Sequence, residues 1–191
     1  MFDLEPLCLA GLFRLHRPIM RDHRGSFRKI AHADAFAAAG LRNDFTEQFV
    51  TVSATGVLRG MHFQTPPHSH DKLVTVLSGR IIDVVVDLRP GPDHGRSVAL
   101  ELSGEEGASL YVPSGLAHGF LALEEALLLY DVTSVHAPAH DLGIRFDSFG
   151  YSWPIKDPVL SDRDRALPKL SDFITPFPPA PATKTKFKQS F

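Results

Sequence analysis

The pattern of hydrophobic and polar positions predicts a chain of short strands with very little helix. Residues 73–77 are apolar and β-branched and end at Ser78-Gly79, a turn signal, and residues 80–88 alternate weakly between apolar and polar positions. A helix is predicted at 34–40, and the charged segment from residue 160 could form a short helical turn near the strands. The other predicted strands are 9–15, 45–53, 97–102, 110–112, 120–123 and 126–135. Short strands at this spacing favour an antiparallel sandwich or barrel.

One stretch, residues 57–79, concentrates polar side chains between apolar segments. It holds three histidines, one arginine and one lysine: His62, His68, His70, Arg59 and Lys72. A polar cluster that opens onto a buried strand sits on a rigid element, which suits a working site. The alternative is a surface hairpin with incidental charges.

Composition narrows the class of protein without identifying it. The 191 residues suit one domain, and a formal net charge of −2 gives no reason to expect nucleic acid or a membrane surface as partner. Cys8 is the single cysteine, so neither a disulfide framework nor a thiolate metal cluster is expected. The N-terminus has no basic segment followed by a long apolar run, which is the pattern of a secretory signal peptide. A cytoplasmic protein is therefore expected. Residues 1–174 are predicted to form the domain, and the Pro- and Lys-rich residues 175–191 a disordered or surface-bound tail.

Residues 107–118 have the form G-x5-P-x-G-x2-H, which resembles the second motif of the cupin superfamily. This turn would start a strand with His118 pointing into a barrel, although a satisfied core histidine is the alternative. The first cupin motif differs, because Lys72 stands where a glutamate ligand would be. A lysine among ligands opposes cation binding, so no metal is expected.

Six blocks of sequence together resemble the dTDP-4-dehydrorhamnose 3,5-epimerase family, a metal-free branch of the cupins. The blocks are 22–27, 57–64, 71–74, 83–89, 112–120 and 160–164. One such block would be a weak sign, but six in order are specific. The resemblance implies an all-β, cupin-type antiparallel barrel or jelly roll. It also implies a homodimer, in which residues 1–20 would supply a strand that is exchanged between subunits.

The resemblance implies an isomerase that inverts C3, C5 or both in a nucleotide-diphosphate 4-keto-6-deoxy sugar. His62 would be the base, Asp164 would orient its ring, Lys72 would stabilise the enolate oxygen, and Tyr130 would be the acid on the other face. No cofactor is implied, because the ketone is the electron sink. The residues that it implies for substrate binding are Arg24, Phe27, Arg59, His118, Asp141 and Arg163.

Each of these roles has a structural alternative. Tyr130 could be an aromatic of the barrel wall, Asp164 a solvated charge, and Lys72 a lysine that protects an edge strand from aggregation. Strict alternation also places Arg59 and His62 on opposite faces of one strand. Either Gly60 carries a bulge that resets the register, or one of the two residues acts from a loop.

Several positions depart from the family pattern and put the nucleotide base and the hexose in doubt. Glu47 and Phe49 occupy the usual Gln-x-Asn, Lys29 replaces a glutamate, and His136 falls near a usual tyrosine. Two other functions compete with epimerisation. One is a metal-dependent cupin that uses His62, His68, His70 and His118. The other is a sugar-nucleotide-binding cupin without catalysis.

Overall fold

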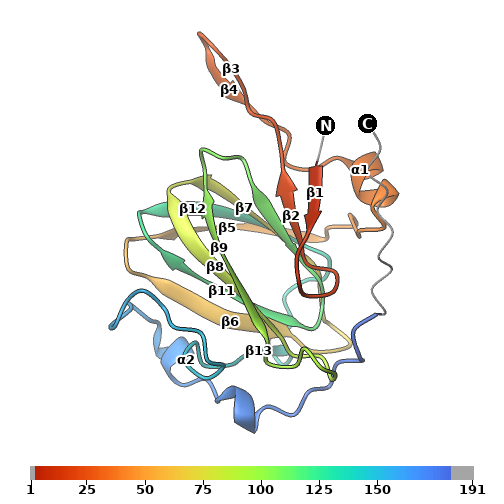
Figure 1. Ribbon diagram of the computed structural model, residues 1–191, viewed down its shortest axis with the longest axis vertical. Helices are drawn as coiled ribbons and strands as arrows, with labels where there is room; N and C mark the ends of the chain where they lie inside the picture. Colours follow the sequence, from red (N-terminus) through yellow and green to blue (C-terminus); the bar gives the residue numbers. More distant parts are fainter. Residues whose placement is uncertain (1–2, 182–191) are drawn as a thin grey trace.

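Two antiparallel sheets face each other and enclose the main hydrophobic core (Figure 1). The computed structural model describes residues 3–181. The strands are β1 (Asp3–Pro6), β2 (Phe13–His16), β3 (Met20–Asp22), β4 (Gly25–Phe27), β5 (Glu47–Ser53), β6 (Leu58–Gln64), β7 (Lys72–Ser78), β8 (Arg80–Asp87), β9 (Ser97–Ser103), β10 (Ser109–Val112), β11 (Leu116–Ala122), β12 (Ala126–Val132) and β13 (Asp141–Gly143). The helices are α1 (Ala33–Ala38), α2 (Asp162–Arg165) and the 3-10 turn Leu170–Asp172. The all-β, cupin-type barrel predicted from the sequence is confirmed.

The sheet orders explain how distant segments meet. One sheet has six strands in the order β1-β2-β10-β7-β12-β5, and the other has five in the order β13-β6-β11-β8-β9. Inward side chains such as Val76, Ile81, Phe120 and Leu128 fill the space between them. Because this apolar packing closes one part of the barrel, polar inward positions can gather in the remainder.

Other segments of the chain pack against the outer face of each sheet. On the six-stranded sheet, Phe36 of α1 packs with Tyr111 and Leu73. The C-terminal part of the chain runs across the five-stranded sheet (Figure 1), and Phe177 is buried there against Phe63, with ring centroids 5.9 Å apart. Phe177 belongs to the predicted tail 175–191, of which residues 182–191 lie outside the described part of the chain. The domain boundary at 174 stays a prediction.

The N-terminal strands pair within this chain: β1 pairs with β2, and β2 with β10. Exchange of residues 1–20 between subunits therefore stays a prediction, and residues 1–2 lie outside the described range. The hairpin β3–β4 projects away from the barrel (Figure 1). Among residues 3–181, no helix has both the length and the apolar composition that a membrane crossing requires.

Strand positions differ from the sequence prediction where local residues do not favour extension. The segment 9–15 becomes a strand only from Phe13, because Leu9–Leu12 form a turn closed by the bond from Leu12 N–H to the Leu9 carbonyl, 3.0 Å. Strand β11 begins at Leu116 rather than at residue 120. Its first four residues include an alanine and a glycine and none that is β-branched, so propensity gives no signal there.

Candidate active site

A cavity of about 340 Å³ opens between the two sheets beside the edge strands β5 and β13. His62, Lys72, Tyr130, His118 and Arg59 all line it, together with other side chains from both sheets. Side chains of β6 and β11, in the five-stranded sheet, line one wall, and side chains of β7 and β12, in the six-stranded sheet, line the opposite wall. A ligand in the cavity would therefore be contacted on two faces.

A bulge in β6 brings Arg59 and His62 to the same cavity. His62 pairs with His118, and Arg59 pairs with Phe120, so three steps along β6 match two along β11. The extra residue lies next to Gly60, whose φ of +134° favours glycine. A Cβ at Gly60 would meet the Cα of Gly119 at 2.5 Å. Of the two possibilities that the sequence left open, the bulge is the one observed.

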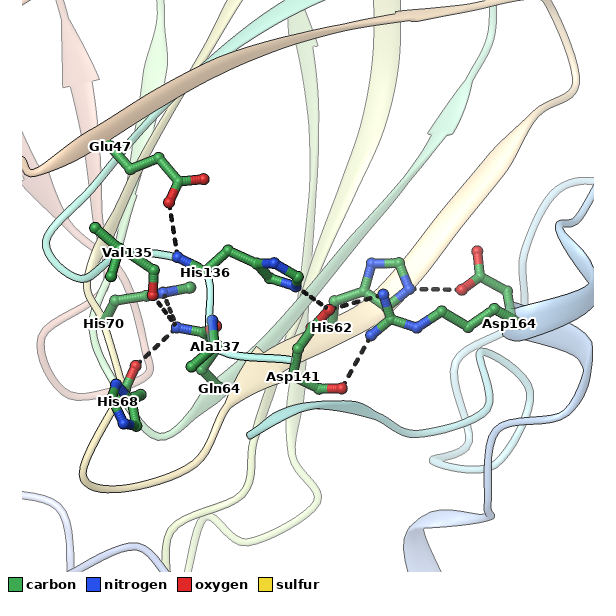
Figure 2. Close-up of polar contacts among 11 residues, drawn as sticks. Glu47, His62, Gln64, His68, His70, Val135, His136, Ala137, Asp141 and Asp164 are labelled. Atoms are coloured by element: carbon green, nitrogen blue, oxygen red, sulfur yellow. Dashed lines mark hydrogen bonds and ion pairs between the residues drawn. The ribbon is translucent and has the colours of Figure 1, made fainter. Parts of the chain in front are cut away.

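His62 and Asp164 form a close pair. The Nε2 atom of His62 lies 2.5 Å from Oδ1 of Asp164, which reaches the site from α2 (Figure 2). The His62 side chain is 29% exposed and Asp164 only 4%. Burial acts to raise the pKa of Asp164, but the hydrogen bond and the charge of His62 outweigh it, and the net shift is downward. The carboxylate thus fixes the ring while the ring keeps access to the cavity.

Lys72 is a buried cation at the start of β7. Its Nζ donates to the backbone carbonyl of His62 at 3.1 Å. Burial lowers the pKa of Lys72 to about 8, and the charges of Asp141 and Asp83 oppose that shift. An ammonium in such a dry position is suited to stabilising negative charge that develops on a ligand. The edge-strand alternative does not apply, because β7 lies between β10 and β12.

Tyr130 lies on β12, in the sheet opposite to that of His62. It is 6% exposed, and burial, followed by the charge of Asp83, raises the pKa of its hydroxyl. Phe49 is its register partner on β5, and the two rings stack at 4.8 Å with an angle of 10°. The hydroxyl therefore stays protonated and its ring is held in one plane.

His118 is part of a second, fully enclosed pair. Its Nε2 lies 2.8 Å from Oδ2 of Asp83, and the two side chains are 3% and 0% exposed. The His118 ring also meets that of Tyr130 edge-on, with centroids 6.0 Å apart. His118 is thus a buried histidine with a satisfied hydrogen bond, and it also lines the cavity.

Charged groups gather at the edge of the cavity next to β13. Arg163 binds Asp141 at 2.8 Å, and the His136 ring approaches the same carboxylate at 3.1 Å. Burial acts to raise the pKa of Asp141, but these partners outweigh it and the net shift is downward. Glu47 accepts a bond of 2.7 Å from the backbone N–H of His136. The departures from the family pattern at positions 47, 49 and 136 therefore fall in the cavity wall.

Gln64 and His70 are among the cavity residues for which the sequence predicted no role in epimerisation. Alternation along β6 was the available signal for Gln64, since it stands two residues after His62. His70 entered only as one ligand of the alternative metal site. Figure 2 shows Gln64 between the loop that carries His68 and His70 and the loop at Val135 and Ala137.

The structure does not bring every predicted residue to the cavity. Arg24 and Phe27 lie on the β3–β4 hairpin, where Arg24 binds Asp22 at 2.6 Å and Phe27 is 55% exposed. Within residues 3–181, no three histidine, cysteine or carboxylate side chains are grouped to hold a metal ion. His68 instead packs against His140, with centroids 4.8 Å apart.

Comparison with known proteins gives consistent matches along nearly the whole chain. A family model described as dTDP-4-dehydrorhamnose 3,5-epimerase matches residues 6–172. The dTDP-4-dehydrorhamnose 3,5-epimerase of Mycolicibacterium smegmatis is 36% identical over 170 residues, covering 87% of this chain and 85% of the relative. A dTDP-4-dehydrorhamnose 3-epimerase of Streptomyces niveus is 35% identical over 167 residues, covering 85% and 81%. The structure of a Legionella pneumophila dTDP-6-deoxy-D-glucose-3,5-epimerase in complex with dTDP-4-keto-L-rhamnose matches with a TM-score of 0.89 and 30% identity, covering 95% of this chain and 100% of that one.

Proposed function

Because the chain belongs to the dTDP-4-dehydrorhamnose 3,5-epimerase family, we propose that it inverts C3, C5 or both of a nucleotide-linked 4-keto-6-deoxy sugar. The observation that carries this proposal is the placement of His62 and Tyr130 in opposite sheets across one cavity, with the ammonium of Lys72 beside them. Inversion needs a base on one face of a carbon and an acid on the other, and the two sheets supply one each.

The steps follow from these positions. His62 removes the proton from the carbon next to the ketone, and the C–H electron pair becomes the double bond of an enolate. Lys72 stabilises the negative charge that moves to the ketone oxygen. Tyr130 then gives a proton to the opposite face, which closes the C–H bond with inverted configuration. His62 can accept the proton because Asp164 stabilises the imidazolium that forms.

The diphosphate would bind at the arginines of the cavity edge. Arg59 and Arg163 line the cavity from β6 and α2. Guanidinium groups bind phosphate oxygens through paired N–H donors, which favours these two residues over Lys72 for that role. Lys72 is deeper and is left for the sugar.

We further propose that Arg24 and Phe27 act on the cavity of a second copy in a homodimer. The hairpin that carries them projects from its own barrel (Figure 1), and its Met20 and Phe27 are 57% and 55% exposed. Apolar side chains on a projecting hairpin favour burial against another protein surface. This arrangement reconciles the expected substrate role of Arg24 and Phe27 with their distance from the cavity of their own chain.

Mixing two inactive variants tests the dimer proposal. Subunits with His62→Ala and subunits with Arg24→Ala are each expected to be deficient. A heterodimer of the two would contain one intact site if Arg24 acts on the partner, so mixing followed by subunit exchange should restore activity. No recovery in a demonstrated heterodimer would contradict action across the interface.

The experiment that tests the function itself is incubation in D2O with dTDP-, GDP- and CDP-linked 4-keto-6-deoxy sugars. Deuterium at C3, C5 or both would report the substrate and the inverted centre together. Tyr130→Phe should keep exchange by His62 yet lose inversion, because no acid remains on the opposite face. Absence of exchange with every sugar would contradict the proposal and favour a sugar-nucleotide-binding protein. The cytoplasm stays the expected location.

A further inference from the structure

The amide of Gln64 has a single consistent orientation. Its Oε1 accepts a bond of 2.6 Å from the backbone N–H of Ala137. Its Nε2 donates to the carbonyls of His68 at 2.8 Å and Val135 at 3.2 Å. A flipped amide would place an oxygen against two carbonyls and an NH2 against an N–H, so the network fixes which end is the donor.

This orientation fixes the tautomer of His70. The Nε2 donor of Gln64 lies 3.1 Å from Nδ1 of His70 (Figure 2). An NH2 group cannot accept a hydrogen bond, and its two protons are shared among Nδ1 and the two carbonyls, so Nδ1 is the unprotonated nitrogen. Burial and then the charge of Lys72 lower the pKa of His70 to about 3, so the ring is neutral near pH 7. Its proton is therefore on Nε2.

The resulting N–H of His70 has no partner within residues 3–181. Its Nε2 is buried and makes no hydrogen bond with a described group. A buried donor without an acceptor costs free energy, so an unpaired one in a native structure calls for an explanation. His70 is one of the residues that line the cavity. An acceptor that reaches this nitrogen from the cavity would complete its hydrogen bonding.

We propose that the Nε2–H of His70 is a substrate-binding donor for a neutral oxygen, hydroxyl or keto, of the bound sugar. This inference rests on the proposed function, because the sugar is the ligand that it concerns. His70 stands two residues before Lys72, and both side chains line the cavity. A neutral donor suits an uncharged sugar oxygen, whereas the diphosphate is matched by the guanidinium groups of Arg59 and Arg163.

Two variants at position 70 separate the donor from the bulk of the ring. His70→Gln keeps an N–H donor, and His70→Leu removes it at similar volume. His70→Leu should lower kcat/KM on the order of 10-fold, the effect of one lost hydrogen bond, and His70→Gln should stay within about threefold of the wild type. His68→Leu is the matched control, since His68 packs on His140 outside the cavity.

Nitrogen-15 NMR of the histidine rings gives a readout that a structural role would not move. Wild-type His70 should show protonated Nε2 and unprotonated Nδ1 near pH 7. A dTDP-linked 4-keto-6-deoxy sugar should shift the Nε2–H signal, and dTDP alone should leave it unchanged. Protonated Nδ1, an equal response to dTDP alone, or full activity of His70→Leu would each overturn the inference. If wild-type protein binds the sugar with this shift but inverts no centre, the proposed function fails while the donor role stands.

Discussion

Two histidine–carboxylate pairs lie side by side in the barrel and differ in their access to the cavity. His62 and His118 are direct register partners on β6 and β11, and each places Nε2 on an aspartate, at 2.5 Å and 2.8 Å. In the first pair the imidazole is 29% exposed, whereas in the second both side chains are enclosed. The pairing chemistry is the same, so exposure separates their roles.

The difference shows why one pair suits proton transfer and the other suits positioning. A ring that keeps a free edge in the cavity can take a proton from a ligand, and its carboxylate stabilises the charge that results. In the enclosed pair the ring is held by Oδ2 of Asp83, and the pair is shielded from solvent, which suits a positioning role. Asp83 additionally acts on Lys72 and Tyr130 through its charge.

Removing the exposed ring is expected to have the largest effect on catalysis. His62→Ala should lower proton exchange at the sugar by about 10²–10⁴-fold, the contribution of a positioned base. Asp164 should remain in place because Ser161 caps α2 through the Asp164 backbone N–H, at 3.1 Å. Deuterium incorporation measures the effect, and retention of more than a tenth of wild-type exchange would contradict the role of base.

Removing the enclosed ring should instead appear first in stability. His118→Ala leaves the Asp83 carboxylate buried without its partner, which typically costs about 3–5 kcal/mol in the free energy of unfolding. Urea unfolding of His118→Ala beside His62→Ala measures the contrast. An equal loss of stability in the two variants would mean that exposure does not separate the pairs.

Lys72 binds the backbone carbonyl of His62, and the charge of Asp83 acts on it, so its loss should rank next. Lys72→Ala is expected to lower turnover by about 10²–10³-fold, as for deletion of one oxyanion donor, with a smaller change in substrate affinity. Lys72→Met serves as a control of similar length that keeps the apolar stem. Near-normal turnover in either variant would contradict the enolate role, and so would loss confined to affinity.

The smallest predicted effect is on the pH profile. Since burial holds the pKa of Lys72 at about 8 and the charged form is required, turnover should fall as pH rises through about 8. The charge of Asp83 acts to raise that pKa, so Asp83→Asn should move the alkaline limb to lower pH. An alkaline limb that does not respond to Asp83→Asn would have to come from another group.

The hydrophobic pattern predicted most strands, but it did not predict which side chains meet in the cavity. The runs 73–77 and 80–88 match β7 and β8 because their apolar, β-branched residues are buried on the sheet. The three-residue strand β13 has no such pattern, and Asp164 reaches His62 from 102 positions away. Only the resemblance to a family pointed to Asp164. The Gln64–His70 contact was beyond pattern alone, because it depends on which end of an amide faces a ring.

The close approach of Gly60 to Gly119 determines which residues of β6 face the cavity and which face outward. Arg59 before the bulge and His62 and Gln64 after it all line the cavity, although one is at an odd and two are at even positions. A side chain at Gly60 would collide with the Gly119 backbone and so oppose the bulge, and without the bulge the strand would alternate regularly. One half of the strand would then turn its polar groups to the apolar outer layer. A transplant of this site into another barrel must therefore carry both glycines along with the residues that bind substrate.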